Sequence, residues 1–371
     1  MHRRIDLPDF TSEHLAVQPI ERSETIPSSW YTDVRMHKTD CDGIHTKTWQ
    51  YICHISRLPD PGNYLTATIA GNPIILVRGK DSQLRAFYNV CRHRGGPLAI
   101  DEQGTCNALQ CKYHGWTYLL DGSLRGVPQF DRVELFDKKD YGLIPVRLEE
   151  WEGLLFVNLS KQLDLSSVSS IMQGISDRIA PASLHSKNFC KRLTYDINCN
   201  WKVYVDNYLE GYHLPYVHPE LCNLLDYQHY TTETFEHYSL QYSPFTGKEN
   251  LYGTTNGEAF YYFIFPNLML NILPGRLQIN LVVPLGHNKT RVLFDYYYDD
   301  ITSDQAQKLI DEDIRYSDVI QREDMGICEF VQRGLESAAY DKGRFSVEME
   351  KGVYHFQCQL KKAYSGIVES S

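Results

Sequence analysis

The stretch "NVCRHRGGPLAIDEQGTCNALQCKYHGWTY", from Asn89 to Tyr118, contains two similar segments, CRHRGG and CKYHGW. Each places a histidine shortly after a cysteine, and the pairs are Cys91 with His93 and Cys111 with His114. One tetrahedral zinc ion is the simpler use for such a set, but zinc fingers usually pair both cysteines in one knuckle. A [2Fe-2S] cluster with two cysteines on one iron and two histidines on the other needs one residue of each kind from each of two loops. The spacing therefore favours the iron-sulfur cluster over zinc.

The sequence around these segments predicts a small all-β domain. Between about residues 46 and 159, short apolar runs alternate with glycine and proline, as is typical of strands in a small antiparallel barrel or sandwich. Asp121 and Gly122 predict the turn of a hairpin just after the second Cys/His segment. Glycines in both segments allow the backbone to fold closely around a cluster.

After residue 160 the pattern changes to a mixture of helices and long strands. The run from 258 to 300 predicts several strands, and a helix is predicted from Ser303, which can cap its amino terminus, to about Ser337. We therefore expect an α+β protein with three parts. They are an N-terminal segment over residues 1–45 that packs on the last part, an all-β domain over 46–160, and a second domain over 161–371.

Composition and charge limit the classes of function. The chain has 371 residues and a net charge of -10, which disfavours nucleic acid and anionic membrane surfaces as partners and suits a small cationic ligand better. No apolar run is long enough to span a membrane, and the first residues lack the apolar stretch of a secretory signal, so we expect a cytosolic protein. The chain has no glycine-rich dinucleotide motif, so NAD(P)H and flavin would bind a partner.

A second group of polar residues lies in "WKVYVDNYLEGYHLPYVHPEL", residues 201–221. Its acids and histidines are Asp206, Glu210, His213 and His218. Two histidines five positions apart do not share a face of a straight helix, but Pro215 between them would break or kink the helix and could bring both imidazoles to one metal ion. The alternative is that these are ordinary polar residues of an amphipathic segment.

A carboxylate on the predicted C-terminal helix could complete such a site, because non-haem Fe(II) that activates O2 is held by two histidines and one carboxylate. Asp324 interrupts an apolar stripe that includes Ile320, Ile327, Cys328 and Val331. A buried carboxylate without a partner is costly, and a metal ion would compensate it. Glu323 lies almost as close to the stripe, so periodicity leaves the choice between the two acids open.

These motifs resemble those of the alpha subunits of Rieske non-haem iron oxygenases, and the resemblance extends over nearly the whole chain. The pattern C-x-H-x17-C-x2-H followed by GWTY is similar to the Rieske motif of the oxygenases. The resemblance implies a Rieske domain joined to a catalytic domain of the helix-grip, START-like type, with a curved antiparallel sheet and a long C-terminal helix. The segments DNYLEGYHLPYVHPEL and GRFSVEMEKGVYHFQ are similar to the branch that contains choline, glycine betaine and carnitine monooxygenases.

The resemblance also implies roles for individual residues. Cys91, His93, Cys111 and His114 would hold the cluster, and His213, His218 and Asp324 would hold a mononuclear Fe(II). Glu210 would bridge the two metal centres, where many ring-hydroxylating members have aspartate, and Asp206 is a further catalytic candidate. Electrons would come from a separate NAD(P)H-dependent flavin and iron-sulfur reductase or a ferredoxin, O2 would be the co-substrate, and the chain would form a homotrimer.

The sequence leaves the substrate open. A quaternary ammonium group is usually recognised by aromatic faces, and the chain has 26 tyrosines, so we expect hydroxylation or N-demethylation of a small compound of the choline, betaine or carnitine type. Hydroxylation of an aromatic ring is the main alternative. A Rieske electron-transfer or redox-sensing protein without catalytic iron is the alternative of another class.

Overall fold

The computed structural model of the chain describes residues 7–221, 229–245 and 257–369. They belong to two compact units. The small unit is His45–Val168, and the large unit combines Met1–Ile44 with Ser169–Ser371.

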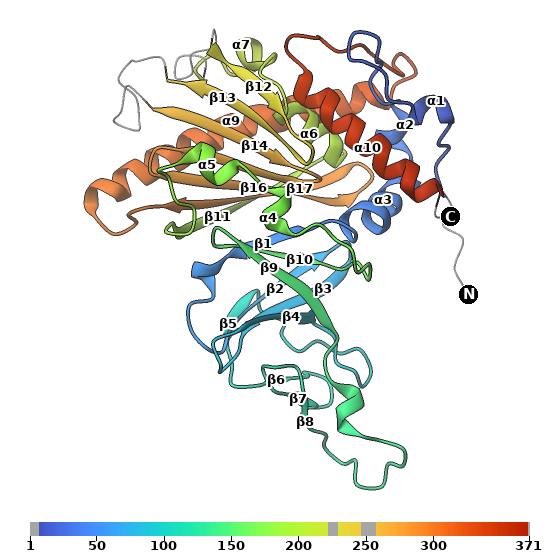
Figure 1. The fold of residues 1–371 in the computed structure, drawn as a ribbon, viewed down its shortest axis with the longest axis vertical. Helices are drawn as coiled ribbons and strands as arrows, with labels where there is room; N and C mark the ends of the chain where they lie inside the picture. Colours follow the sequence, from blue (N-terminus) through green and yellow to red (C-terminus); the bar gives the residue numbers. More distant parts are fainter. Residues whose placement is uncertain (1–6, 222–228, 246–256, 370–371) are drawn as a thin grey trace. The chain divides into compact units, whose positions relative to one another are not determined.

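The small unit consists of strands joined by turns and by two short 3-10 helices, Ile55–Arg57 and Lys138–Tyr141. One antiparallel sheet has the strand order β1-β10-β9-β4-β3-β2-β5, and a second has the order β6-β7-β8 (Figure 1). The strands are β1 (Gln50–His54), β2 (Asn63–Ile69), β3 (Asn72–Arg78), β4 (Leu84–Tyr88), β5 (Gln103–Thr105), β6 (Leu109–Gln110), β7 (Thr117–Tyr118), β8 (Leu124–Gly126), β9 (Pro145–Trp151) and β10 (Leu154–Asn158). β7 and β8 pair across Asp121 and Gly122, and Gly122 has a φ of 88°. The expected all-β domain and its hairpin are confirmed.

Strand β3 is buried on both faces and separates two apolar clusters. Consecutive side chains of a strand point to opposite faces, so Ile75 and Val77 pack in the cluster that contains Cys91 and Cys111, whereas Ile74 packs in the other. The Cys/His loops therefore rest on an apolar core of their own.

An antiparallel sheet forms the centre of the large unit. Its order is β11-β17-β16-β15-β14-β13-β12, so β12 to β17 form a meander and β11 is added beside β17 (Figure 1). The strands are β11 (Asn188–Ile197), β12 (Thr231–Thr234), β13 (Tyr238–Pro244), β14 (Glu258–Ile264), β15 (Leu268–Leu273), β16 (Arg276–Gly286) and β17 (Lys289–Tyr298).

The turn between β15 and β16 sets which side chains of β16 point to each face. Leu273 pairs with Arg276 across Pro274 and Gly275, and Gly275 has a φ of 72°. Proline suits the first central position of such a turn, and glycine tolerates the positive φ of the second. Strand β16 therefore begins at Arg276, and its side chains alternate between polar and apolar over residues 276–281.

Helices cover this sheet and complete the α+β fold expected from the sequence. They are α1 (Ser12–Leu15), α2 (Ser29–Thr32), α3 (Val34–Asp40), α4 (Val168–Ile171), α5 (Ile175–Ile179), α6 (Trp201–Tyr208), α7 (Leu214–Val217), α9 (Asp304–Leu335) and α10 (Lys351–Glu369). α9 lies along one face of the sheet, where the Tyr296 hydroxyl bonds to Ser317 (Figure 1). The predicted start of α9 is confirmed, because Oγ of Ser303 accepts a hydrogen bond from the Ala306 amide.

The buried face of α9 is more polar than the sequence predicts. Val331, expected on the apolar stripe, is 44% exposed, whereas Asp313, Ser317 and Gln321 are buried. These polar residues are stabilised by hydrogen bonds to the sheet and to α6 rather than by apolar packing. The stripe in the sequence therefore located the helix but not all of its buried face.

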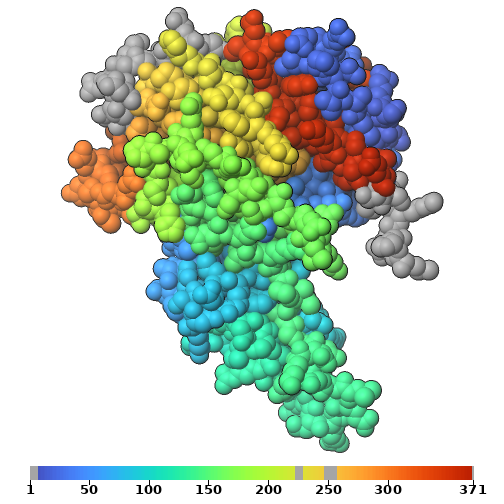
Figure 2. All heavy atoms as spheres, viewed as in Figure 1, coloured from blue at the N-terminus to red at the C-terminus, as the bar shows by residue number. Residues whose placement is uncertain are grey.

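Helix α10 was not expected, although its buried residues Val353, Phe356, Leu360, Tyr364 and Ile367 recur at helical spacing. It packs against the N-terminal segment and against strands β12 and β13. In the space-filling view, the blue N-terminal segment and red α10 lie side by side on the surface of the large unit (Figure 2). Among the helices that the structure describes, none has both the length and the apolar character needed to cross a bilayer.

Candidate functional site

Two loops of the small unit carry the Cys/His pairs on turns of the same form. The Gly95 amide donates to the Cys91 carbonyl at 3.0 Å, and the Gly115 amide donates to the Cys111 carbonyl at 3.1 Å. Both cysteines are buried, with exposures of 2% and 4%. The two similar segments of the sequence are thus two similar loops in the structure.

The two loops are in close contact with each other. The Lys112 amide donates to the Pro97 carbonyl at 3.0 Å. A Cβ atom added to Gly96 would lie 2.9 Å from Sγ of Cys111. Only glycine allows this approach without displacement of the sulfur, so the loops form a close-fitting cradle around the cysteine side chains.

The imidazoles of both loops lie together at one side of this cradle. The ring centroids of His93 and His114 are 4.8 Å apart, and His93 stacks on Trp116. Nδ1 of His93 is buried and has no hydrogen-bond partner among the described residues. A buried nitrogen of this kind is satisfied if it binds a metal.

The four residues suit a two-iron cluster better than one zinc ion. Among the described residues, the set of His, Cys, Asp and Glu side chains close enough to share a single ion is His213, His218 and Asp324, and the loop residues do not form such a set. Burial raises the pKa of the Cys91 thiol, so the buried sulfurs need a nearby cation to be held as thiolates. The donor types and their separation fit a [2Fe-2S] cluster.

Tyr118 is a residue of this site without a role predicted from the sequence. Its hydroxyl oxygen accepts a hydrogen bond from the Arg92 amide at 3.0 Å and lies 3.3 Å from Sγ of Cys91. Burial, followed by the contact with Cys91, raises the pKa of Tyr118. The hydroxyl therefore keeps its proton and can donate to the sulfur. The GWTY motif that follows His114 is the signal that marks this residue.

In the large unit, His213 and His218 lie on either side of the short helix α7. α6 ends at Tyr208, His213 directly precedes α7, and His218 directly follows it. The expectation that Pro215 breaks or kinks a helix between them was wrong, because Pro215 lies in the first turn of α7, where its missing N–H is not needed. A single helical turn, rather than a kink, brings the two imidazoles together.

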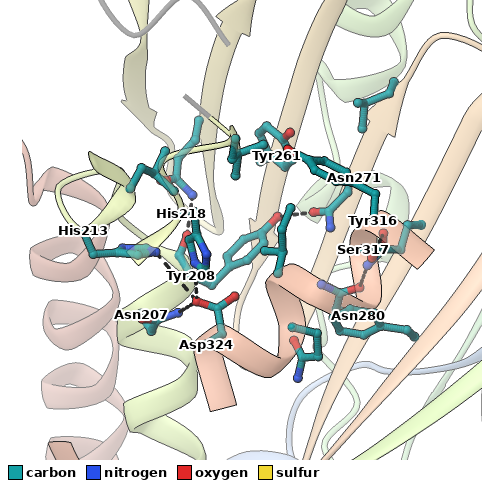
Figure 3. Close-up of a pocket in the computed structure, with 18 of the residues that line it drawn as sticks. Asn207, Tyr208, His213, His218, Tyr261, Asn271, Asn280, Tyr316, Ser317 and Asp324 are labelled. Carbon is teal, nitrogen blue, oxygen red and sulfur yellow. Dashed lines mark hydrogen bonds and ion pairs between the residues drawn. The ribbon is translucent and has the colours of Figure 1, made fainter. Parts of the chain in front are cut away.

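His213, His218 and Asp324 converge on one point (Figure 3). One ligand atom from each lies within 4.8 Å of the others. Nε2 of His218 is 2.9 Å and Nε2 of His213 is 3.8 Å from Oδ1 of Asp324, and Asn207 donates to the same oxygen at 2.7 Å. Two imidazoles and one carboxylate can hold an iron(II) ion and leave other positions open.

Two further carboxylates contact the imidazoles at Nδ1, the ring nitrogen that does not face Asp324. Nδ1 of His213 lies 2.6 Å from Oε1 of Glu210, and Nδ1 of His218 lies 2.6 Å from Oε2 of Glu323. A carboxylate accepts, so each Nδ1 donates its proton to its glutamate, and Nε2 is the nitrogen of each imidazole that remains to bind a metal ion beside Asp324. The two acids that periodicity could not separate thus have different positions, with Asp324 at the point of convergence and Glu323 behind His218.

The charges at this point suit a cation. Burial lowers the pKa of His218, but the carboxylates of Asp324 and Glu323 outweigh this and leave the pKa raised. His218 is 2% exposed as a residue. A metal ion can take the place of the proton that the acids would otherwise hold on the imidazole.

Asp206, the other catalytic candidate, is not at the point of convergence. Its carboxylate accepts hydrogen bonds from the Tyr31 hydroxyl at 2.6 Å and from Nε2 of Gln357 at 3.3 Å. Burial raises the pKa of Asp206 to about 7. It joins α6 to the N-terminal segment and to α10, and it precedes Glu210 by four residues.

A buried ion pair fixes the start of α6. Nζ of Lys202 lies 2.6 Å from Oδ2 of Asp40, and the Tyr364 hydroxyl donates to Oδ1 of the same acid at 2.6 Å. Both charged side chains are fully buried. Since the pair is satisfied by additional hydrogen bonds, it holds α6 against α3 and α10 in one position.

Two cavities border these residues. The triad cavity, of about 130 Å³, is lined by His213, His218 and Asp324 and by many aromatic and amide side chains (Figure 3). The second cavity, of about 490 Å³, is lined by Asp206 and by residues of α9, α10 and the N-terminal segment. Glu210 and His213 line both. The wall between the cavities therefore contains one proposed ligand and the acid that holds it.

Two family models match the chain. That of the Rieske [2Fe-2S] domain matches residues 48–137, and that of the ring hydroxylating alpha subunit catalytic domain matches residues 185–366.

Relatives of known activity match almost the whole chain. The chloroplastic choline monooxygenase of Arabidopsis thaliana is 35% identical over 96% of this chain and 86% of that protein. The carnitine monooxygenase oxygenase subunit of Escherichia coli K12 is 33% identical over 96% of this chain and 98% of that protein. The crystal structure of the quaternary ammonium Rieske monooxygenase CntA in complex with L-carnitine has a TM-score of 0.84 at 30% identity, covering 96% of this chain and 99% of that chain.

Proposed function

The chain belongs to the alpha subunits of the Rieske ring-hydroxylating oxygenases, and from this membership we propose that it oxidises a quaternary ammonium compound of the choline, betaine or carnitine type. The family uses a [2Fe-2S] cluster, a mononuclear iron and O2. The chain is therefore an oxygenase component, and its electrons come from a separate reductase or ferredoxin.

The ligands are assigned from the geometry of the two sites. Cys91, His93, Cys111 and His114 hold the cluster, and His213, His218 and Asp324 hold the mononuclear iron. The convergence of the last three side chains within 4.8 Å carries the proposal of an oxygenase. A Rieske protein that only transfers electrons has no need of this second site.

When bound, the iron would supply the activation of O2. One oxygen atom then enters a C–H bond of the substrate and the other becomes water, and the reaction consumes two electrons and two protons. If the bond belongs to an N-methyl group, the carbinolamine product breaks down to formaldehyde and the demethylated amine. The protein's own residues keep the geometry fixed. Glu210 and Glu323 orient the imidazoles, and Asn207 restrains Asp324.

Glu210 is assigned as the bridge between the two kinds of metal centre. It contacts His213 and also lines the second cavity, so its carboxylate is within reach of a group that enters there. In a homotrimer, a cluster histidine of the neighbouring protomer would be that group. The trimer, the type of reductase and a cytosolic location remain predictions.

The lining of the triad cavity favours a cationic substrate over an apolar aromatic one. Its aromatic members are Tyr204, Tyr208, Tyr230, Tyr261, Phe294 and Tyr316. Aromatic faces attract ammonium groups, which cannot donate hydrogen bonds when fully methylated. Amide side chains that share the lining would gain no hydrogen bonds from a hydrocarbon ring, whereas the hydroxyl or carboxylate end of a choline, betaine or carnitine type compound could bond to them.

Metal analysis together with turnover tests this function. The purified chain should contain the two irons of the cluster and about one further iron. With a matched reductase and NADH it should consume O2 in the presence of choline, betaine or carnitine, with formaldehyde released where an N-methyl group is hydroxylated, and it should be inactive without the reductase. A chain that holds only cluster iron, or that oxidises simple aromatic acids instead, would contradict the proposal.

A further inference from the structure

One wall of the triad cavity is formed by polar side chains of two neighbouring strands. Arg276, Gln278 and Asn280 alternate along β16 and point to the same face of the sheet. Asn271 of β15 pairs with Gln278 and belongs to the same wall. Asn271 and Asn280 are labelled in Figure 3, on the side of the cavity away from His213.

This wall offers hydrogen-bond donors to the cavity. Oδ1 of Asn271 accepts from the Tyr208 hydroxyl at 2.6 Å, and Oδ1 of Asn280 accepts from Gln278 at 2.7 Å. The amide oxygens are thus already used by neighbouring protein groups. Asn271 and Asn280 both line the cavity, so their side-chain N–H groups can donate to a ligand that carries acceptor atoms.

Arg276 adds positive charge to the wall. Its Nε lies 3.0 Å from Oδ2 of Asp313, which also accepts a hydrogen bond from the Tyr298 hydroxyl at 2.5 Å. Arg276 lines the triad cavity, whereas Asp313 is fully buried behind it and is not part of the lining. The ion pair therefore presents its positive end to the cavity.

Gln321 supplies a donor that the protein leaves unused. The side chain is 2% exposed and lines the triad cavity. Its Oε1 accepts from the Tyr204 hydroxyl at 2.6 Å, but Nε2 has no hydrogen-bond partner in the described part of the chain. A buried donor without a partner is unfavourable, and an acceptor atom of a bound ligand would satisfy it.

The acids at the metal site and the acid that pairs with Arg276 lie at different positions along helix α9. Asp313 precedes Asp324 by about three helical turns, or roughly 16 Å along the axis. Carboxylates therefore lie at the end that holds the metal ligands, and the guanidinium lies toward the other end. Gln321, one turn before Asp324, lies between them.

We infer that the substrate is a zwitterion, an ammonium carboxylate bound with its N-methyl groups toward His213, His218 and Asp324 and its carboxylate toward Arg276 and the amide wall. The inference rests on the proposed function and narrows its substrate class. An ammonium alcohol such as choline has no anion to pair with the guanidinium. A carboxylate gains charge-assisted hydrogen bonds there.

Direct binding tests the inference without turnover. Calorimetric titration of the whole iron-loaded protein would compare γ-butyrobetaine, its methyl ester and choline. The ester keeps the ammonium group and the chain length but loses the negative charge. We expect the acid to bind about tenfold or more tightly than the ester or choline.

Two test variants, each with a matched control, locate the recognition of the carboxylate. Because Arg276→Met alone would leave Asp313 buried without its cation, the test uses the double change Arg276→Met with Asp313→Asn, which should abolish the preference for the acid. Arg192→Met with Asp295→Asn makes the same exchange at an ion pair that does not line the cavity and should keep the preference. Gln321→Met should weaken binding of the acid several-fold, whereas Gln305→Met on the exposed face of α9 should not.

The outcomes separate the inference from the function on which it rests. If wild-type protein binds the ester or choline as tightly as the acid, or if the Arg276/Asp313 double variant keeps the preference, the inference is wrong while the proposed function stands. If none of the three compounds binds, the proposed function is wrong and the inference with it.

Discussion

Nε2 of His218 lies 2.9 Å from Oδ1 of Asp324, although 106 positions separate the two residues. Asn207 of α6 donates to the same oxygen at 2.7 Å. Residues from α6, from the end of α7 and from α9 thus meet at one carboxylate oxygen. Such a site exists only when the large unit is folded, so metal binding and folding of that unit are linked.

Replacement of Asp324 by alanine should remove the mononuclear iron and leave the cluster. The two histidines alone provide too few ligands, whereas the cluster loops belong to the other unit. Iron content should fall by about one atom per chain while the absorption and electron paramagnetic resonance spectra of the reduced cluster stay unchanged. Asp311→Ala, on the exposed face of α9, is the control. Loss of the cluster spectrum, or unchanged iron content, would contradict the ligand assignment.

Replacement of Glu323 by glutamine should weaken the iron site without abolishing it. The amide accepts a weaker hydrogen bond from Nδ1 of His218 and no longer favours the ligand form of the imidazole. We expect the affinity for iron to fall about tenfold in competition with a chelator. Glu312→Gln makes the same change at an exposed position of α9 and should have no effect. Equal affinity in the Glu323 variant and wild type would show that this contact does not support the ligand.

Replacement of Gly96 by alanine should impair assembly of the cluster. The added Cβ would lie 2.9 Å from Sγ of Cys111 and equally close to Cβ of Tyr113. The sulfur must then move, and the cradle no longer fits a cluster. Purified protein should have a reduced ratio of cluster absorbance to protein. Gly126→Ala, where the nearest atom would be 3.9 Å away, should assemble the cluster normally. Full cluster content in both variants would argue against the cradle.

Asp206 should make the stability of the large unit depend on pH. Burial raises its pKa to about 7 from 3.8, so between about pH 4 and pH 7 the folded protein holds a proton that the unfolded chain has lost. The free energy of unfolding contributed by this group therefore falls as pH rises through that window. Asp206→Asn removes the dependence.

Thermal unfolding at several pH values measures this effect. The melting temperature of Asp206→Asn relative to wild type should rise by a few degrees between about pH 5 and pH 8. Asp311→Asn, an exposed acid on α9, serves as the control and should show a constant difference. A constant difference for Asp206→Asn as well would mean that Asp206 is ionised in the folded protein throughout.

The cluster loops could be predicted from the sequence because their chemistry is local. Each loop keeps its cysteine and histidine within a few positions, and its glycines are adjacent. The turns seen in the structure are closed by hydrogen bonds inside each loop. Tyr118 was not assigned a role, because its contact with Cys91 depends on how one loop packs against the other.

The helical pattern in the sequence narrows the carboxylate ligand of the second site to Asp324 or Glu323, but it does not choose between them. Asp324 and Glu323 differ by one position, which is a rotation of about 100° around the helix. Which of them faces His213 depends on how α9 is rotated against the sheet. That rotation is set by contacts such as Tyr296 with Ser317 and Tyr298 with Asp313, and an apolar stripe does not record polar contacts.

The proline and glycine between β15 and β16 have a consequence for the divergence of related enzymes. They determine that Arg276, and not Leu277, points into the cavity. Helix α9 carries both Asp313, which pairs with Arg276, and the proposed iron ligand Asp324. A shift of this cation by two residues along β16, with its acid moved one turn along α9, would alter the length of substrate accepted and leave the oxygen chemistry untouched. Selectivity and reactivity can therefore evolve separately in this architecture.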